Sequence, residues 1–514
     1  MTAPSTFSPR TGLLLAALAT AGPLAAQTTP QPARPASAPA AALAAPAAAP
    51  TGPWSLQRAV DYALEHNLGV RLNQLQARSN GQVLLQSKAA LLPTVNLNGT
   101  QNWQYGRSVN PLTYEFQNQT VRANNFSGVA QVALFQGFQL RNTVRRNELD
   151  YEASVQDIEK AKNDLSLNVA SAFLQLVLAQ ELVRANGLYV QNTQSQLTRS
   201  QLLLKAGSIP ESTLLDSQSQ LATDQLNVTT AQNQASIARL NLLQLLNLDP
   251  ATTPDFQIEV PVLPDPDAEG AYALNTNEVF QTASSNLPEI KAAELRVRSA
   301  GRSLDIARGA YYPRLFLTGS LFSGYSSSTV VQVANGSVSY RSAPVVTVDA
   351  TGTPTGTTPY AVVTPVPGYD VLPRAFFDQL DTNLGKSVQF ALQIPVFNGL
   401  QVRTGVQRAI INEEAQRVRA EQTRLTLRQS IEQAYADARA AQLQYAAATR
   451  QVAALTTTQR NAEIRFNNGL LSGTEFNIIK NNLAYATSNQ LNAKYTFIFR
   501  RKVLDFYQGK PLTL

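Results

Sequence analysis

The sequence of 514 residues contains no cysteine. A disulfide framework, a thiolate metal site and a catalytic thiol are therefore excluded, and so is a lipid-bearing cysteine at a mature amino terminus. Charged residues are also scarce, at 15% of the chain. The net charge of +7 is scattered, without a basic stripe interleaved with aromatic residues. This distribution argues against nucleic-acid binding.

Long apolar runs are missing as well. Beyond the amino terminus no stretch of eighteen apolar residues occurs, so no membrane-spanning helix is expected. A membrane-spanning strand stays open, because its hydropathy signal is far weaker. At the amino terminus, Arg10 precedes the apolar run GLLLAALATAG and the segment PLAAQ. These features predict a secretory signal peptide over residues 1–26. Residues 27–53, nearly all Ala, Pro, Thr and Gln, predict an extended linker.

A long internal duplication organises the rest of the chain. The phrase LFQGFQLRNTVRR begins at residue 134, and VFNGLQVRTGVQR begins 262 residues later. The match continues without a gap to Leu221 and Leu483, and an earlier block around Gly99 repeats around Gly319. The second half is therefore a copy of the first. We expect a first repeat over 54–248, a connector over 249–276 and a second repeat over 277–514.

Each repeat contains the heptad pattern of a coiled coil, with apolar residues at alternating steps of four and three. No proline interrupts either pattern, so each predicts one helix of nearly seventy residues, about 100 Å long at 1.5 Å per residue. Shorter helices are expected over 56–92, 211–248, 277–312 and 474–507. Two short helices placed end to end match one long helix, a layout that suits a wall or tube. The heptad positions are Leu165, Val169, Ala172, Leu176, Ala179 and Val183 in the first repeat, and Leu427, Ile431, Ala434, Ala438, Ala441 and Tyr445 in the second.

Four segments show the period-two alternation of strands, with an apolar and a polar face. They lie at 93–105, 126–134, 315–325 and 387–396. Such strands can cross a bilayer when tilted, but four cannot close a barrel, and an open sheet edge is too costly in lipid. The chain must therefore share a barrel with copies of itself. Residues 107–125 and 326–382 are expected to be loops, the second a long external loop with weak strand character.

The duplicated phrase marks the joint at which a membrane strand stops and a long helix starts. Phe135 and Gly137 occupy the joint in the first repeat, and Phe397 and Gly399 occupy it in the second. Glycine relieves the backbone at such a change of direction. Pro395 fits a strand end, where one hydrogen-bond donor of the ladder is dispensable.

Taken together, the signal peptide, the duplicated strand–strand–helix plan and the Phe-x-Gly joint resemble the TolC-like outer-membrane efflux channels. The resemblance covers residues 54–514. It implies an α+β membrane protein in which a homotrimer shares one barrel of twelve strands in outer-membrane lipid. Long coiled-coil helices would form a tunnel across the periplasm, and the connector 249–276 would lie in its equatorial region. The resemblance also implies two partners, a periplasmic adaptor protein and an inner-membrane pump reached through it.

The family's tip motif, an aromatic residue, a glycine and then an acid, is well matched by Phe466, Gly469 and Glu475. The first repeat keeps the glycine but has Leu204 at the aromatic position and Asp216 one helical turn late. The resemblance implies that the two tip turns form the periplasmic entrance and contact the adaptor. The two acids would recur as rings under threefold symmetry, or simply favour helix N-termini. The turn residues are Gly207, Ser208, Ile209 and Pro210, and Gly469, Leu470, Leu471 and Ser472.

No set of residues suggests catalysis, a cofactor or a metal. The LGKS sequence at 384–387 lacks the first glycine of a phosphate-binding loop, because Leu380 occupies that position. The acidic segment 264–269 would either touch a divalent ion or serve as a turn-rich connector. We therefore expect a passive conduit and not an enzyme. Two rival functions stay open, a structural tether of the envelope and a stand-alone pore without a pump.

Overall fold

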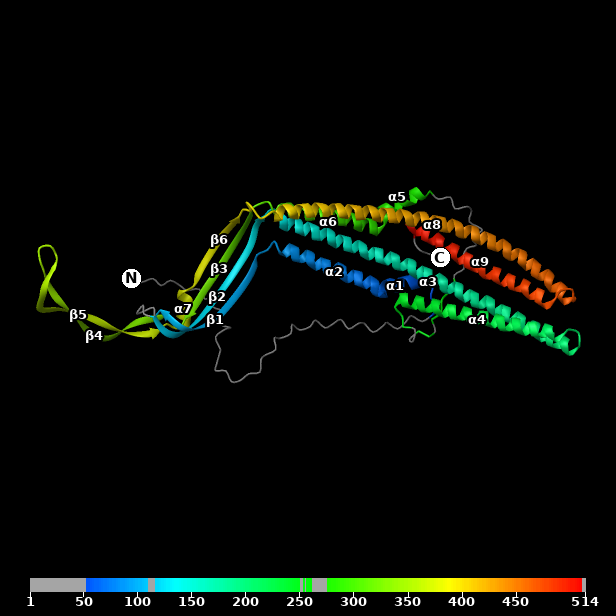
Figure 1. Ribbon diagram of the computed structural model, residues 1–514, viewed down its shortest axis with the longest axis horizontal. Coiled ribbons are helices and arrows are strands. Elements are labelled where there is room, and N and C mark those ends of the chain that lie inside the picture. Colours follow the sequence, from blue (N-terminus) through cyan, green and yellow to red (C-terminus); the bar gives the residue numbers. More distant parts are fainter. Residues whose placement is uncertain (1–51, 110–115, 250–252, 255, 261–274, 511–514) are drawn as a thin grey trace, which may run out of the picture.

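The computed structural model describes residues 52–109, 116–249, 253–254, 256–260 and 275–510. The expected signal peptide and all but the last two residues of the expected linker lie outside this part. The molecule is elongated, with a β-sheet region at one end and a layer of long helices at the other (Figure 1). The first repeat contains α1 (Leu56–His66), α2 (Leu68–Ala89), β1 (Thr94–Val109), β2 (Phe116–Gln136), α3 (Gln139–Lys205) and α4 (Glu211–Leu246).

The second repeat follows the same plan with a hairpin and a short helix added. Its elements are α5 (Thr276–Asn286), α6 (Pro288–Gly309), β3 (Arg314–Ser326), β4 (Val330–Val348), β5 (Pro354–Pro373), α7 (Phe376–Thr382), β6 (Gly385–Gln393), α8 (Gln401–Asn467) and α9 (Gly473–Tyr507).

The two long helices agree with the sequence. Both α3 and α8 contain 67 residues, which gives each a length of about 100 Å. All six heptad residues of the second repeat are buried, and so are those of the first except the half-buried Val183. Small residues at these positions, such as Ala172 and Ala438, let neighbouring helices approach closely.

The shorter helices stack as expected, but two of them are broken. α4 and α9 run along the far halves of α3 and α8, while α2 and α6 run along the halves nearer the sheet (Figure 1). The expectation of unbroken helices over 56–92 and 277–312 is wrong. Asn67 ends α1 and caps α2, since its Oδ1 accepts from the Gly69 N–H at 2.8 Å. In the second repeat Leu287 is extended because Pro288 follows it.

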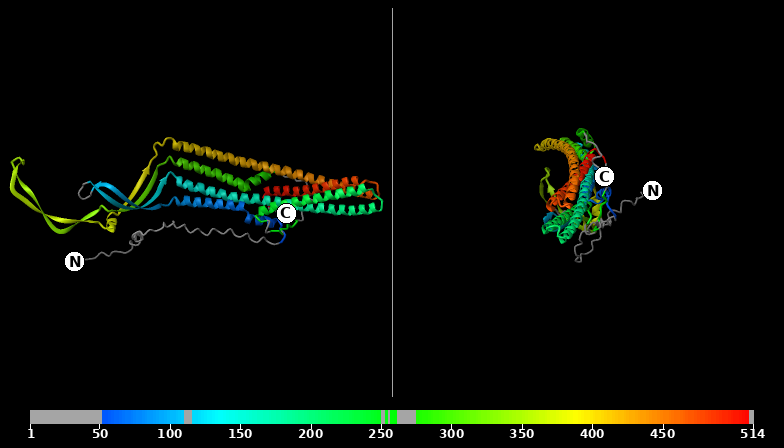
Figure 2. Two further views of the ribbon diagram at one scale, coloured as in Figure 1. Left: turned by 60° about the horizontal axis from the view of Figure 1, so that its bottom comes forward. Right: turned by 90° about the vertical axis from the view of Figure 1, so that its right-hand side faces the viewer.

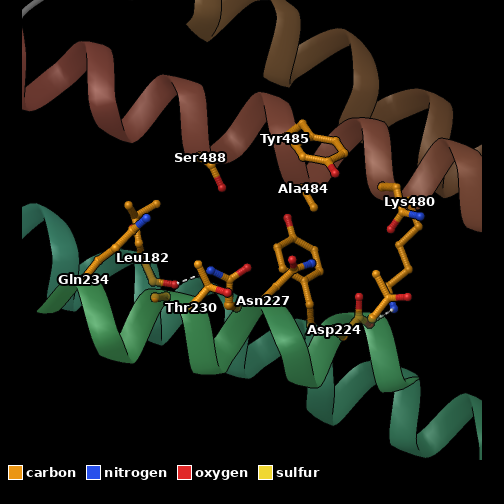
Figure 3. Close-up of a pocket in the computed structure, with 14 residues that line it drawn as sticks. Leu182, Asp224, Asn227, Thr230, Gln234, Lys480, Ala484, Tyr485 and Ser488 are labelled. Atoms are coloured by element: carbon orange, nitrogen blue, oxygen red, sulfur yellow. Dashed lines mark hydrogen bonds and ion pairs between the residues drawn. The ribbon is translucent and has the colours of Figure 1, made fainter. Parts of the chain in front are cut away.

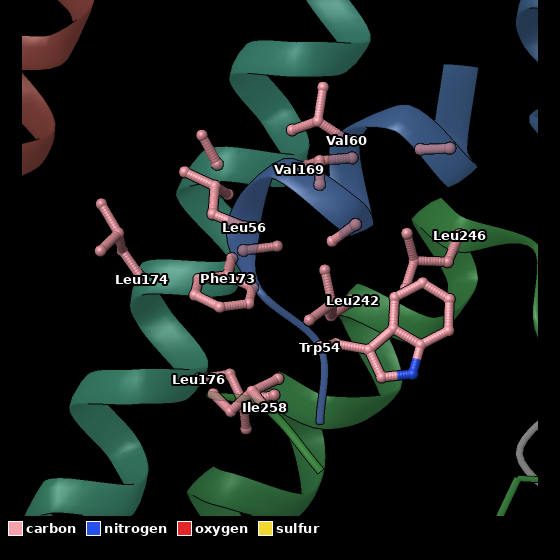
Figure 4. Close-up of a cluster of buried hydrophobic side chains, with 14 of the residues drawn as sticks. Trp54, Leu56, Val60, Val169, Phe173, Leu174, Leu176, Leu242, Leu246 and Ile258 are labelled. Atoms are coloured by element: carbon pink, nitrogen blue, oxygen red, sulfur yellow. The ribbon is translucent and has the colours of Figure 1, made fainter. Parts of the chain in front are cut away.

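The main hydrophobic core lies halfway along α3, where α1, α4 and the connector meet (Figure 4). Trp54, Phe173 and Leu242 are almost fully buried there. Ile258 of the connector pairs with Trp54 as a short parallel bridge, and it joins the same cluster. α3 also contains an eighteen-residue window with a mean hydropathy of 1.3, enough by length and composition to cross a membrane. Its residues in this core account for that apolar character.

The sheet contains four antiparallel strands in the order β1-β2-β3-β6. β1 and β6 are its two edges, and neither has an outer neighbour in the described part of the chain. The helices continue the same lateral order, α2, α3, α6 and α8, so the whole molecule is one layer with two open sides (Figure 2).

Three strand expectations need correction. The supposed loop over 107–125 is largely strand, because backbone pairing continues outward to Val109 opposite Phe116. The supposed loop over 326–382 contains the antiparallel hairpin β4–β5, whose register shifts at three places, and the helix α7. The strand expected over 387–396 ends at Gln393. Its last partner is Arg314, the first residue of β3, so no residue of β3 is left to pair with residues 394–396.

Candidate functional site

The sheet has one apolar and one polar face along its whole width. Directly opposed residues in neighbouring strands share a face, so the register sorts the side chains. Across β1, β2, β3 and β6 one face is built mainly of large apolar residues and glycine, and the other mainly of amides and hydroxyls. The apolar face carries Val95, Leu97, Gly99, Phe126, Gly128, Ala130, Val132, Leu315, Leu317, Gly319, Leu321, Val388, Phe390 and Leu392. The polar face carries Asn96, Asn98, Thr100, Asn125, Ser127, Gln131, Thr318, Ser320, Ser387, Gln389 and Gln393.

Phe376 of α7 packs against Phe126 and Tyr325 at the outer end of the apolar face. Elsewhere no other element of the described part of the chain covers either face. On the apolar face, Leu97 of the edge strand β1 is 83% exposed, Val388 of the edge strand β6 is 74% exposed, and Leu321 of the inner strand β3 is 52% exposed. Such a large exposed apolar surface normally meets lipid or another protein. A sheet that is apolar outside and polar inside is the arrangement of a membrane barrel with an aqueous lumen.

The duplicated phrase lies between a strand and a long helix in each repeat. Gly137 and Gly399 have φ of +55° and +59°, and the next residues, Phe138 and Leu400, are also left-handed. Two consecutive left-handed residues turn the chain from strand into helix, and only glycine adopts the first without strain. Phe135 packs edge-on against Phe138, with ring centroids 5.4 Å apart. Phe397, its counterpart in the second repeat, is 84% exposed.

The two joints differ in their surroundings. A Cβ atom on Gly137 would lie 2.1 Å from the carbonyl oxygen of Gly309, at the end of α6. A Cβ atom on Gly399 would meet nothing within 4 Å. Gly309 is thus part of the first joint, although the sequence analysis did not identify it. A glycine at the end of an expected helix was the visible signal. The first joint is a close backbone crossing inside the chain, whereas the second lies at its open side.

The tip turns are formed by the expected glycines at the far ends of the long helices. Gly207 and Gly469 have φ of +69° and +72°, and neither has an atom within 4 Å of a hypothetical Cβ. In each turn the residue after the glycine donates back across the last helical turn. The Ser208 N–H reaches the Leu203 carbonyl and the Leu470 N–H reaches the Arg465 carbonyl, both at 2.9 Å. These are the hydrogen bonds of a Schellman helix end.

The two acids of the tip hold hydrogen bonds. Glu475 and Ser472 form a reciprocal capping box at the start of α9. The Ser472 hydroxyl and backbone N–H donate to the Glu475 carboxylate at 2.8 and 3.1 Å. These hydrogen bonds, with a smaller contribution from Arg465, hold the pKa of Glu475 below its ordinary value. Asp216 accepts from the Thr474 hydroxyl at 3.2 Å, which links the two tip hairpins.

The aromatic residue of the tip motif also has a partner. Phe466 stacks on Phe476 with ring centroids 4.9 Å apart and planes 11° apart. This stack ties the last turn of α8 to the first turn of α9. Leu204 and Leu214 occupy the matching positions of the first repeat, 262 residues earlier, so the first tip hairpin lacks that stack.

A buried polar cluster joins the two tip hairpins, α3–α4 and α8–α9, and it was missed by the sequence reasoning. Lys480 of α9 and Asp224 of α4 form an ion pair at 3.3 Å, with side chains only 9% and 6% exposed. Thr193 of α3 accepts from Lys480 and donates to Asp224. Gln220 and Asn481 exchange two further hydrogen bonds at 2.9 and 3.1 Å. Ser217 and Asp224 are polar residues one heptad apart on α4, and they were the signal in the sequence that could have revealed this cluster.

A groove of about 250 Å³ runs beside this cluster between α4 and α9 (Figure 3). Its lining is mostly amide and hydroxyl side chains from both hairpins, including Asn227, Thr230, Gln234 and Ser488. Tyr485 projects over the opening from α9 and is 69% exposed. The groove is lined mainly by neutral polar side chains, and its two charged lining residues, Asp224 and Lys480, are paired with each other.

Comparison with known proteins gives the family. The sequence model described as outer membrane efflux protein matches residues 59–248 and 380–505. The pyoverdine export outer membrane protein OpmQ of Pseudomonas putida is 28% identical over 187 residues, 35% of this chain and 37% of that protein. Protein CyaE of Bordetella pertussis is 22% identical over 399 residues, 77% of this chain and 71% of that protein. The match to OpmQ therefore spans less than half of that relative.

Solved structures share the fold. CusC superposes with a TM-score of 0.69 at 17% identity, covering 89% of this chain and 92% of CusC. The outer membrane protein VceC of Vibrio cholerae superposes with a TM-score of 0.68 at 12% identity, covering 89% of this chain and 97% of VceC. At these identities the likeness establishes the architecture of helices and strands.

Proposed function

Since this chain belongs to the outer membrane efflux protein family, we propose that three copies form a passive exit duct through the outer membrane. One end is a shared barrel of twelve strands in lipid, and the other is a helical tunnel that reaches across the periplasm. An inner-membrane pump supplies the energy and delivers cargo through an adaptor protein. The observation that carries this proposal is the open four-stranded sheet with one apolar and one polar face.

The sheet edges support assembly from several copies. β1 and β6 would each expose a row of unpaired backbone N–H and C=O groups in lipid, where no water could bond them. Pairing β1 of one copy with β6 of the next removes both edges at once. Repeated around a ring, the same contact closes the barrel, because a head-to-tail interface closes when its rotation permits.

The helical layer supports the same arrangement. α2 and α8 lie at its two sides, and each exposes apolar residues at helical spacing. On α8, Ile411, Val418 and Leu425 recur every seven residues and are 60–64% exposed. On α2, Leu72 and Leu75 are 67% and 50% exposed. Heptad-spaced apolar residues normally form a coiled-coil seam, so α8 of one copy fits against α2 of the next.

The tip supports docking of an adaptor. Gly207 and Gly469, with Ser208, Ile209, Pro210, Leu470, Leu471 and Ser472, form the ends of the two helical hairpins farthest from the sheet. Their glycines have open space around them. Asp216 and Glu475 are exposed there, so three copies would place rings of both acids at the entrance. These rings would add to the capping role of Glu475 and to the hydrogen bond between Asp216 and Thr474.

A direct test is conductance in planar lipid bilayers. The duct predicts discrete, water-filled pores from the purified protein, whereas a structural tether predicts none. A stand-alone pore would also conduct, but it would not depend on the tip. Leu470→Asp changes a tip side chain that is 69% exposed, so it should leave conductance and trimer yield unchanged while reducing export in cells that contain the adaptor and pump. Normal export by this variant would discard the docking role.

A further inference from the structure

We propose that the β4–β5 hairpins of neighbouring copies pack against one another through one apolar face, as a collar beyond the barrel. This inference rests on the proposed assembly and adds a second contact between copies to it. The hairpin extends from the sheet end of the molecule, opposite the tip (Figure 1). It also lies outside the residues that match the family, which stop at 248 and resume at 380.

The hairpin is held firmly at its base. Gln379 of α7 is 1% exposed, and its side chain bonds the Ser326 N–H at 2.9 Å and the carbonyl oxygens of Ser326 and Arg374 at 3.1 and 2.9 Å. Phe376 packs on Tyr325 of β3, with ring centroids 5.1 Å apart. These contacts fix the direction in which the hairpin leaves the barrel strands, so every copy would present it in the same way.

Register shows that the outer half of the hairpin has two different faces. Val338 lies opposite Pro367, Tyr340 opposite Pro365, and Ser342 opposite Val363, so these six side chains share one face. We name it the Tyr340 face. The other face carries Ser339, Arg341 and Thr364 beside Val362 and Val366. Tyr340 is 72% exposed and Val363 is 55% exposed.

The prolines restrict how a partner can approach. Pro365 and Pro367 have no N–H to donate, so they fit a strand only where that group would point away from the partner strand. The outer edge of β5 therefore lacks two donors in a short stretch, and another strand cannot extend the hairpin there. A partner that approaches β5 must therefore cover a face.

A second copy of this chain fits that face best. The segment 330–373 contains only three charged residues, Arg341, Asp349 and Asp370, so copies meet with little repulsion. An isolated two-stranded hairpin is marginally stable in water, which favours burial of its apolar face. Assembly of the barrel would already place the hairpins around one opening. Their contact would then cost no further translational entropy, because the copies are joined through the barrel. Around a symmetry axis the same residue of each copy would then lie near its equivalents.

The absence of native cysteine makes a sharp test possible, because a single-cysteine variant cannot form a disulfide within one copy. A disulfide-linked product of twice the monomer mass therefore joins two copies. Val363 and its neighbour Val362 are 55% and 54% exposed but point to opposite faces. Val363→Cys should form disulfide-linked dimers on mild oxidation in membranes, and Val362→Cys should stay monomeric in the same gel. Tyr340→Cys and Ser339→Cys repeat the comparison at a second level of the hairpin.

The outcomes separate this inference from the proposed function. Trimers of Val363→Cys in detergent, measured by sedimentation before oxidation, establish whether assembly occurs. If trimers form but Val363→Cys links no better than Val362→Cys, the hairpin packing is overturned and the duct stands. If no trimer forms, both proposals fall. Selective linkage of Val363→Cys and Tyr340→Cys within trimers is the expected result.

Discussion

Loss of the buried ion pair between the tip hairpins should loosen them by a large amount. Lys480→Met removes the cation and leaves the Asp224 carboxylate in a site that is 94% covered. Breaking a buried pair by deleting one partner costs about 3–5 kcal/mol, since the remaining charge is uncompensated. The matched control is Gln218→Met, which changes the exposed position 262 residues earlier in the first repeat. It should cost less than about 0.5 kcal/mol.

Hydrogen exchange measured by mass spectrometry suits this prediction, because amides near the cluster exchange when the hairpins separate locally. At about 1.4 kcal/mol per factor of ten, the expected loss is roughly two to nearly four powers of ten in protection. Peptides from α4 and α9 around the cluster should show it, and peptides from α2 should not. Replacing both charges, Lys480→Met with Asp224→Leu, should restore most of the protection.

The reasoning would be refuted by two results. One is unchanged exchange in Lys480→Met, which would mean that water reaches the pair and compensates the carboxylate. The other is an equal loss in Gln218→Met, which would mean that methionine itself disturbs the coiled coil.

Three further predictions concern the joints, the sheet and the tip. Gly399→Ala should lower the free energy of unfolding by about 1–2 kcal/mol, because its backbone is left-handed. Gly137→Ala should lower it clearly more, because the new Cβ would lie 2.1 Å from the Gly309 carbonyl oxygen. Equal losses in calorimetry would contradict the difference between the joints. Leu97→Arg should lower insertion by up to about 2–4 kcal/mol while Asn98→Arg is tolerated, and equal membrane yields would reject the assignment of faces. NMR titration of selectively labelled protein should give Glu475 a pKa below that of an unfolded Glu. Its capping contribution is then present above the unfolded pKa and lost as pH falls through the lower folded value, so Glu475→Gln should remove that pH dependence.

The parts of the fold that could be predicted are those in which sequence periodicity and packing coincide. The seam from Leu427 to Tyr445 was visible because each of its residues is buried at heptad spacing. The joints and tip turns were visible because glycine is nearly required at their left-handed positions. Pro288 also marked the break after α5, but the expectation of one helix over 277–312 ignored that signal.

The missed features depend on contacts between distant segments. Asp224 and Lys480 have Ala486 and Gln218 at their repeat-related positions, so the duplication itself gave no hint of their pairing. The β4–β5 hairpin lacked a period-two signal because both of its faces are exposed within one chain. Backbone pairing between the two strands holds it together, so burial within one chain left little pattern in its sequence.

Electron cryomicroscopy of the purified protein in lipid nanodiscs tests the central claim most directly. The account predicts a closed ring of three copies in which β1 pairs with β6 of the next copy and α2 lies beside α8, around a continuous water-filled lumen. A particle with one copy, or one whose β1 and β6 edges stay unpaired in lipid, would contradict it.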